Sequence, residues 1–218
     1  MQLTLTNPVS MVCTSPHVVG NQPEMLHRIV NPGVNLCLWQ RPAQEAVIRE
    51  LSSLKVSDLP DVRCSTSLES FDDDVDTLLQ KQGLDPLAFS NWRIDLRRIA
   101  DHYFGVSDDR DVTLRLVTTE NDDCRRFHVD YTHLRLLCTY RGQGTEWLTN
   151  KQVDRFAQSS GAPNDAIIRF GKPSQFDPFW VGILKGAAYP GNAGHALLHR
   201  SHPIAASADT RVVLCLVS

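Results

Sequence analysis

The C-terminal half of the chain is divided into short apolar segments by turn-forming residues, and this pattern constrains the fold most. After residue 110, strand-like segments are separated by Gly, Asn, Asp and Pro, with no strong helical periodicity between most of them. Such spacing is typical of β-sandwiches and barrels, because alternating βαβ units need a helix between successive strands. We therefore predict a double-sheet jelly roll or barrel. Its expected strands are residues 112–120, 126–131, 134–142, 144–148, 166–171, 179–186, 195–200 and 211–218.

The N-terminal half predicts helices and one strand. The strand is expected at residues 34–41, where apolar and polar residues alternate imperfectly. Pro42 suits the first turn of a helix, and Gly83 and Gly105 suit helix ends. Residues 72–74 are acidic and are expected to complement a helix dipole, with an acidic binding site as the alternative. The predicted helices are residues 42–54, 71–83 and 87–105.

The length and the order of these segments predict one folded domain of the α+β class. A chain of 218 residues suits a single large domain better than two small ones. Residues 1–25 are rich in Thr, Pro, Ser, Asn and Gly and are expected to form a loosely ordered lead-in. The domain is then expected to span residues 26–218, with an α-rich flank at 26–110 and a jelly-roll core at 111–218.

Composition excludes several classes of protein. A net charge of −3 argues against nucleic-acid binding through bulk electrostatics. No apolar run is long enough to span a bilayer, and the N-terminus lacks the pattern of a secretory signal. The six cysteines are scattered without a Cys-x-x-Cys pair, which predicts reduced thiols in a cytoplasmic protein.

The sequence "RFHVDYTHLRLLCTYRGQGTEW" places His128 and Asp130 two residues apart on an expected strand. Because alternate residues of a strand face the same way, an imidazole and a carboxylate can converge there on one ion. His199, in "HALLHRSHP", is the expected third ligand from another strand. Two histidines and one carboxylate on one face of an octahedral metal suit Fe(II) oxygenases, since three positions stay open. His133, His195 and His202 are the competing candidates.

A chelating 2-oxo acid needs a partner for its distant carboxylate. Arg211 begins the last expected strand, and its forked guanidinium matches a carboxylate with two hydrogen bonds. Tyr140 can add a hydrogen bond, or it can be a half-buried structural tyrosine. Arg135 is expected on the opposite strand face from Tyr140. Arg200, beside the distal histidine, suits either an anionic substrate or a neighbouring carboxylate.

The order of these motifs resembles the Fe(II)/2-oxoglutarate-dependent dioxygenases, especially the prolyl-hydroxylase-like branch. The resemblance covers residues 112–218 and rests on "FHVD", "LRLLCTY" followed by "GTEW", "DPFWVGILKG", "LLHRSHPI" and "DTRVVLCLVS". It implies a double-stranded β-helix with Fe(II) held by His128, Asp130 and His199, and 2-oxoglutarate anchored by Arg211. The stretch "FHVDYTHLRLLCTYRGQGTEWL" with "HRSHP" also resembles a conserved bacterial family of unknown function, which implies no activity.

Three functions remain open from the sequence. The first is a dioxygenase that oxidises a small-molecule or peptide substrate. The second is a jelly-roll module that binds zinc or another divalent metal without catalysis, since neutral histidines and a carboxylate also suit zinc. The third is a metal-free interaction protein. Neither the substrate nor the oligomeric state follows from the sequence.

Overall fold

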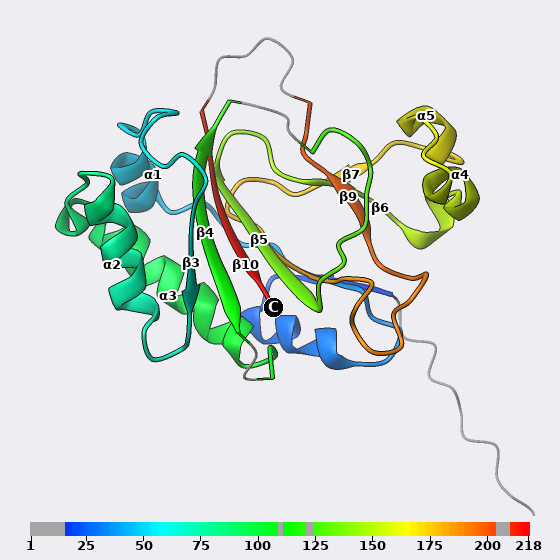
Figure 1. Cartoon of the computed structure of the whole chain (residues 1–218), viewed down its shortest axis with the longest axis horizontal. Coiled ribbons are helices and arrows are strands. Elements are labelled where there is room, and N and C mark those ends of the chain that lie inside the picture. Colours follow the sequence, from blue (N-terminus) through cyan, green and yellow to red (C-terminus); the bar gives the residue numbers. More distant parts are fainter. Residues whose placement is uncertain (1–15, 109–110, 121–123, 204–209) are drawn as a thin grey trace, which may run out of the picture.

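The chain folds into a mixed α/β structure with one large sheet between a layer of helices and a smaller sheet (Figure 1). The computed structural model describes residues 16–108, 111–120, 124–203 and 210–218. Most of the expected lead-in, residues 1–15, therefore lies outside the described residues. Among the described residues, no helix combines the length and apolar character that crossing a membrane requires.

Within the described residues the large sheet contains seven strands, and its central strands are almost completely buried. Every neighbouring pair is antiparallel except the edge pair β1–β2. In spatial order the strands are β1 (His17–Gly20), β2 (Leu36–Trp39), β8 (Val181–Lys185), β5 (Leu134–Arg141), β10 (Arg211–Val217), β4 (Val112–Thr119) and β3 (Val62–Thr66).

The small sheet has three short strands, in the order β7 (Ser174–Gln175), β6 (Glu146–Leu148) and β9 (Leu198–Arg200). Its two strand pairs are antiparallel. Outside this sheet, His128 forms an isolated antiparallel bridge with His199 of β9. The segment that carries the His-x-Asp pair is therefore joined to the small sheet at a single residue pair.

The helices of the N-terminal half cover the outer face of the large sheet (Figure 1). Helix α2 carries three aspartates in its first turn and ends at Lys81, as the helix dipole favours, and it buries Phe71, Val75, Leu78 and Leu79 on one face. The helical elements are η1 (Pro23–Val30), α1 (Glu45–Leu51), α2 (Phe71–Lys81), η2 (Pro86–Phe89), α3 (Ser90–Phe104), η3 (Asn150–Gln152), α4 (Arg155–Ser159) and α5 (Asn164–Ile167).

Alternate residues of the central strands separate two hydrophobic cores. On β5, Leu136 and Cys138 pack toward the helices, whereas Leu137 packs toward the small sheet. On β10, Leu214 packs toward the helices and Cys215 packs toward the small sheet. This alternation follows from the strand geometry, and it decides which side chains can reach the space between the sheets.

Several predicted elements differ from the structure. Residues 17–25, assigned to the lead-in, form β1 and the start of η1, and the N-terminal half supplies β3 as well as helices. Residues 126–131 make only the His128 bridge, and residues 166–171 contain the end of α5 and a second isolated bridge. These strands were wrong because apolar runs this short do not distinguish strand from loop. The prediction of N-terminal helices packed on a β-rich core is confirmed at the level of a mixed α/β architecture with a large sheet.

Candidate metal centre

The backbone places the imidazoles of His128 and His199 side by side. His128 N donates to His199 O and His199 N donates to His128 O, both at 3.1 Å. This reciprocal pair puts the two ring centroids 4.6 Å apart. The two histidines are 71 positions apart in the chain (199 − 128), so only the pairing of β9 with the 126–130 segment brings them together.

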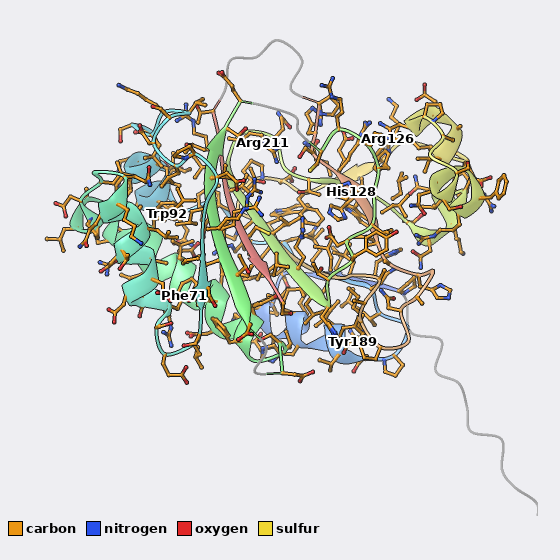
Figure 2. All side chains as sticks on the ribbon, viewed as in Figure 1. Phe71, Trp92, Arg126, His128, Tyr189 and Arg211 are labelled. Carbon is orange, nitrogen blue, oxygen red and sulfur yellow. The ribbon has the colours of Figure 1, made fainter. Side chains whose placement is uncertain are left out.

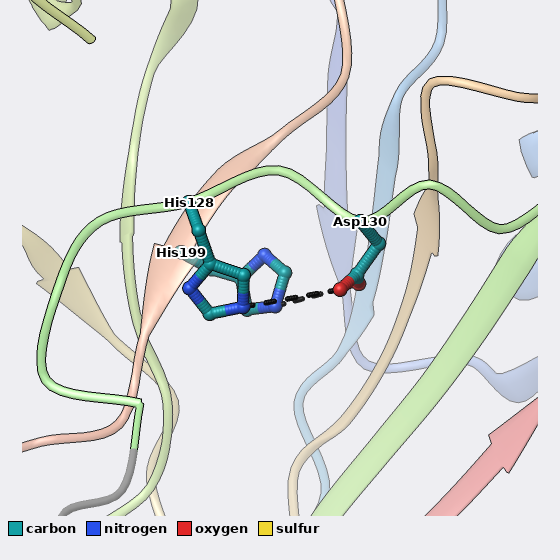
Figure 3. A group of neighbouring side chains, drawn as sticks. All are labelled: His128, Asp130 and His199. Carbon is teal, nitrogen blue, oxygen red and sulfur yellow. Dashed lines mark ion pairs between the residues drawn. The ribbon is translucent and has the colours of Figure 1, made fainter. Parts of the chain in front are cut away.

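Asp130 completes the cluster from the same segment (Figure 3). Its Oδ1 lies 3.9 Å from His128 Nε2, and its Oδ2 lies 3.4 Å from His199 Nε2. Ala187 N donates to Asp130 O at 2.7 Å, which fixes this backbone against the loop after β8. A Cβ on Gly186 would lie 2.1 Å from Thr132 O, so only glycine permits this close approach.

One ligand atom from each of His128, Asp130 and His199 lies within 4.8 Å of the others. Within the part of the chain that the structure describes, no other cluster of three or more His, Cys, Asp or Glu side chains meets this criterion. The structure thus brings together the three residues that the sequence selected as ligands. Two nitrogens and one carboxylate oxygen form a donor set suited to a divalent transition metal.

Hydrogen bonds orient both imidazoles for ligation through Nε2. His128 Nδ1 lies 2.9 Å from Arg126 O, and His199 Nδ1 lies 3.3 Å from Leu197 O. A carbonyl only accepts, so each Nδ1 carries a hydrogen, and Nε2 is the ring nitrogen that a neutral imidazole offers to a metal. Burial lowers the pKa of His199 to about 4, although the Asp130 carboxylate acts in the opposite direction. His199 is therefore neutral at pH 7, as a metal ligand must be.

Asp130 also faces a cation from the large sheet. Arg135 of β5 places Nε 3.0 Å from Asp130 Oδ2, but this contact lacks hydrogen-bond geometry, and Oδ2 has no hydrogen-bond partner among the described residues. A buried carboxylate oxygen without a hydrogen bond is uncommon, and a ligand often accounts for it. The oxygen is thus placed to bind an ion.

Arg211 lines the same cavity as His128, His199 and Arg135. Its side chain is buried, and it has no hydrogen bond or ion pair with any described residue. Burial, and then the nearby charge of Arg115, lowers the pKa of Arg211. A buried guanidinium without a counter-charge is a strong anion-binding group.

Gly142 makes room for the Arg211 side chain. Its φ is +80°, and an added Cβ would lie 2.7 Å from Arg211 Cγ. A larger residue at this position would therefore be strained and would displace the guanidinium. Figure 2 labels Arg211 and His128, which approach the space between the sheets from β10 and from the segment before β5.

Tyr140 does not belong to this site, and its assignment to a bound 2-oxo acid was wrong. Its ring packs in the core under the helices, where its hydroxyl donates to Asp95 Oδ2 at 2.8 Å. Asp95 is also held by Arg41 at 2.5 Å, and burial raises the pKa of Tyr140 well above its ordinary value. Tyr140 is an odd number of residues from Arg135, which lines the cavity on the other strand face.

The other candidate side chains have separate roles. Arg200 Nε lies 2.6 Å from Glu146 Oε2, and His202 Nδ1 lies 2.9 Å from Glu146 Oε1. Arg200 was expected to bind either an anionic substrate or a neighbouring carboxylate, and the structure shows the carboxylate of Glu146 beside it. His195 is exposed and lines a different cavity, while the His133 ring lies 6.1 Å from that of Tyr189.

Sequence reasoning missed the importance of Arg135 and Glu146. Strand parity placed Arg135 on the face opposite Tyr140 but did not show which of the two residues faces the cavity. Glu146 pairs with Arg200 in the β6–β9 register, and short strands of this kind give no signal for their register.

The sequence matches the family described as "Protein of unknown function (DUF1826)" over residues 20–216. The chain belongs to the DUF1826 family. No curated protein matches this DUF1826 chain.

Solved structures similar to the DUF1826 chain include proteins from plants and a fungus. Dioxygenase for auxin oxidation 1 from Arabidopsis thaliana, in a complex with 2-oxoglutarate, is 14% identical with a TM-score of 0.48, covering 94% of this chain and 92% of that one. The rice dioxygenase for auxin oxidation is 15% identical with a TM-score of 0.46, covering 94% and 82%. A full-length Neurospora crassa protein, in a complex with alpha-KG, is 13% identical with a TM-score of 0.43, covering 93% and 83%. Similarities this low assign no activity, so we base the functional inference on the chain's own residues.

Proposed function

We propose that this DUF1826 protein is an Fe(II)- and 2-oxoglutarate-dependent oxygenase with a double-stranded β-helix core. One observation carries the proposal: His128, Asp130 and His199 bring their ligand atoms within 4.8 Å of one another, and the two histidines share a cavity with Arg211, which is buried and has no hydrogen bond or ion pair with a described residue. A metal-ligand triad and an anion-binding guanidinium are the two elements that a chelating 2-oxo acid requires.

The residues present fit an Fe(II) ion. The Nε2 atoms of the two histidines and Asp130 Oδ2, which has no hydrogen bond among the described residues, supply three donors, and the hydrogen-bonded Nδ1 atoms of the histidines fix the ring orientations. Three donors on one side of an octahedral ion leave room for a bidentate co-substrate and O₂. Structural zinc sites are usually closed by four protein ligands, commonly including cysteine.

Bound Fe(II) would supply the redox chemistry that couples decarboxylation of 2-oxoglutarate to oxidation of a substrate C–H bond. In the proposed reaction Arg211 binds the distal carboxylate of the 2-oxo acid and thereby orients it. Arg135 holds the Asp130 carboxylate toward the two imidazoles. Leu137 and Val213 line the cavity with apolar surface that restricts water.

The proposal is tested by adding Fe(II) and 2-oxoglutarate to metal-free protein without O₂. A metal-to-ligand absorption band is expected, followed by succinate formation when O₂ is admitted. His128→Ala and Asp130→Ala should each abolish both signals, and Arg211→Met should weaken 2-oxoglutarate binding and so reduce both signals. His195→Ala is the matched control, because His195 lies outside the cluster. Absence of both signals in the unmodified protein would reject the oxygenase.

A non-catalytic metal-binding module is the second candidate, because two histidines and a carboxylate also bind zinc with water as the fourth ligand. Metal analysis of protein purified without added metal separates the two functions. Zinc that Fe(II) does not displace, together with no 2-oxoglutarate binding, would favour the module. We expect the substrate of an oxygenase here to be a small molecule or a peptide.

A further inference from the structure

A second cavity, of about 390 Å³, lies away from the metal centre. It is formed between the loop after η1 and the loop that follows β8, and it shares no lining residue with the cavity around Arg211. Figure 2 labels Tyr189, one of its walls, far from Arg211 in the view. Its lining residues are Val30, Pro32, Gly33, Asn150, Lys185, Tyr189, Pro190, Gly191, Asn192 and His195.

Lys185 brings a buried positive charge to this cavity. The residue is only 4% exposed, and its Nζ donates to Asn31 O at 2.9 Å and lies 4.3 Å from the centroid of the Tyr189 ring. The ammonium thus lies between the two loops that form the cavity walls. It carries three N–H groups, and the Asn31 carbonyl is its one hydrogen-bond acceptor among the described residues.

No anion compensates this charge within the described part of the chain. Lys185 forms no ion pair there, and none of the described lining residues is acidic. The Cys37 thiol interacts electrostatically with Lys185, but burial raises the pKa of this thiol to about 12, so it is neutral at pH 7. Burial also lowers the pKa of Lys185, as expected for a cation without a counter-charge.

Asn150 also lines this cavity and adds a neutral donor. Its Oδ1 accepts from Asn35 Nδ2 at 3.0 Å and from Arg155 Nη2 at 3.4 Å. Its amide nitrogen, which only donates, has no hydrogen-bond acceptor among the described residues. A second cation, Arg155, is half-buried behind Asn150 and forms no ion pair with a described residue.

We propose that this cavity binds a small oxyanion, a carboxylate or a phosphate, between the Lys185 ammonium and the Asn150 amide. Both groups donate hydrogen bonds, and the bound anion supplies the missing counter-charge. His195, exposed at the edge of the cavity, offers a third donor. The site is independent of the proposed oxygenase function, because its residues lie outside the metal cavity.

Calorimetric titration of the full-length Arg211→Met protein tests the proposal, since this background removes Arg211, which is buried and forms no ion pair with a described residue. Inorganic phosphate and acetate are titrated separately, which distinguishes the two kinds of oxyanion. At least one should bind, and Lys185→Met should weaken that binding at least tenfold. Lys81→Met, which removes an exposed lysine of α2, should leave it unchanged.

Asn150→Asp provides a second variant, which tests the proposal even if the Lys185→Met protein does not fold. The aspartate keeps the shape of the side chain and the acceptor used by Asn35 and Arg155, but it repels an incoming anion, so binding should be lost while the melting temperature is kept. No binding of either anion in the Arg211→Met background would overturn the proposal. Equal binding by the Lys185→Met, Asn150→Asp and Lys81→Met proteins would also overturn it. The Fe(II) experiment is independent of both results.

Discussion

Arg135 Nε lies 3.0 Å from Asp130 Oδ2, the carboxylate oxygen that also faces His199 Nε2 at 3.4 Å. One oxygen of the expected metal ligand therefore has a guanidinium on one side and an imidazole on the other. In the metal-free protein Arg135 is the counter-charge of a buried carboxylate. A bound divalent ion would take over much of that role.

Arg135→Met is expected to destabilise the metal-free protein by about 1–3 kcal/mol, because Asp130 would lose its cationic neighbour. Fe(II) should restore most of the loss, since the ion supplies the missing positive charge. Urea unfolding with a chelator, and again with anaerobic Fe(II), measures both effects. Equal destabilisation in the two conditions would show that Arg135 does not compensate the ligand carboxylate.

The lowered pKa of His199 predicts a pH dependence of stability. The unfolded histidine titrates near 6.5, whereas burial lowers the folded pKa to about 4, so the unfolded chain binds more protons between these values. Stability from this group is complete above pH 6.5 and is lost as the pH falls toward 4, by roughly 3 kcal/mol in total. His199→Asn should flatten this slope in chelator-treated protein. The difference between the two proteins isolates His199 from His17, whose pKa burial lowers similarly; parallel slopes would contradict the prediction.

Arg211→Met should separate stability from co-substrate binding. Arg211 is buried and forms no ion pair with a described residue, which is unfavourable, so the substitution is expected to raise the free energy of unfolding of the metal-free protein by about 1–3 kcal/mol. The same change should eliminate stabilisation of the Fe(II) protein by 2-oxoglutarate. Thermal unfolding with and without 2-oxoglutarate measures both effects, and Arg211→Lys provides the charge-conserving comparison. Retained stabilisation by 2-oxoglutarate would place its anchor elsewhere.

Glu146→Gln tests whether the ion pairs of Glu146 with Arg200 and His202 position His199. Glu146 binds both Arg200 and His202, which follow His199 closely in the chain. Losing its charge should weaken Fe(II) binding by about tenfold, as for other groups that orient ligands through a neighbour. Competition with a chromogenic chelator measures the affinity, with Glu69→Gln as the exposed control. An unchanged affinity would limit Glu146 to a role in stability.

Tyr140→Phe tests the corrected position of that tyrosine. Removing the hydroxyl deletes one hydrogen bond to Asp95, so we expect a loss of about 1–2 kcal/mol in unfolding free energy. The affinity for 2-oxoglutarate should stay the same, because the hydroxyl points toward α3. A decrease in affinity like that of Arg211→Met would instead place Tyr140 at the co-substrate.

The grouping of His128, Asp130 and His199 could be predicted because a His-x-Asp pair on one expected strand is followed by a histidine on a later one. The i, i+2 spacing of His128 and Asp130 correctly predicted that their side chains lie on one side, although the two residues lie on an extended segment with one bridge and not on a continuous strand. The helices at α2 and α3 could be predicted from long periodic stripes and end signals. The β1–β2 edge could not, because parallel pairing between four-residue strands depends on tertiary packing.

Strand parity placed Arg135 and Tyr140 on opposite faces but could not say which face was outward. That choice depends on the helical layer, whose partner is the even-numbered face of β5. The Glu146 contacts likewise depend on the register of three-residue strands. Such features arise from packing between distant segments, which a single sequence does not encode in any local pattern.

The contacts of His128, Asp130 and His199 with both sheets affect the order in which the sheets unfold. Asp130 is tied through Ala187 to the loop that leaves the large sheet, whereas His199 belongs to the small one. An ion bound by both residues would cross-link the two layers. With the ion, the layers should open together in hydrogen exchange; without it, the small sheet should open first.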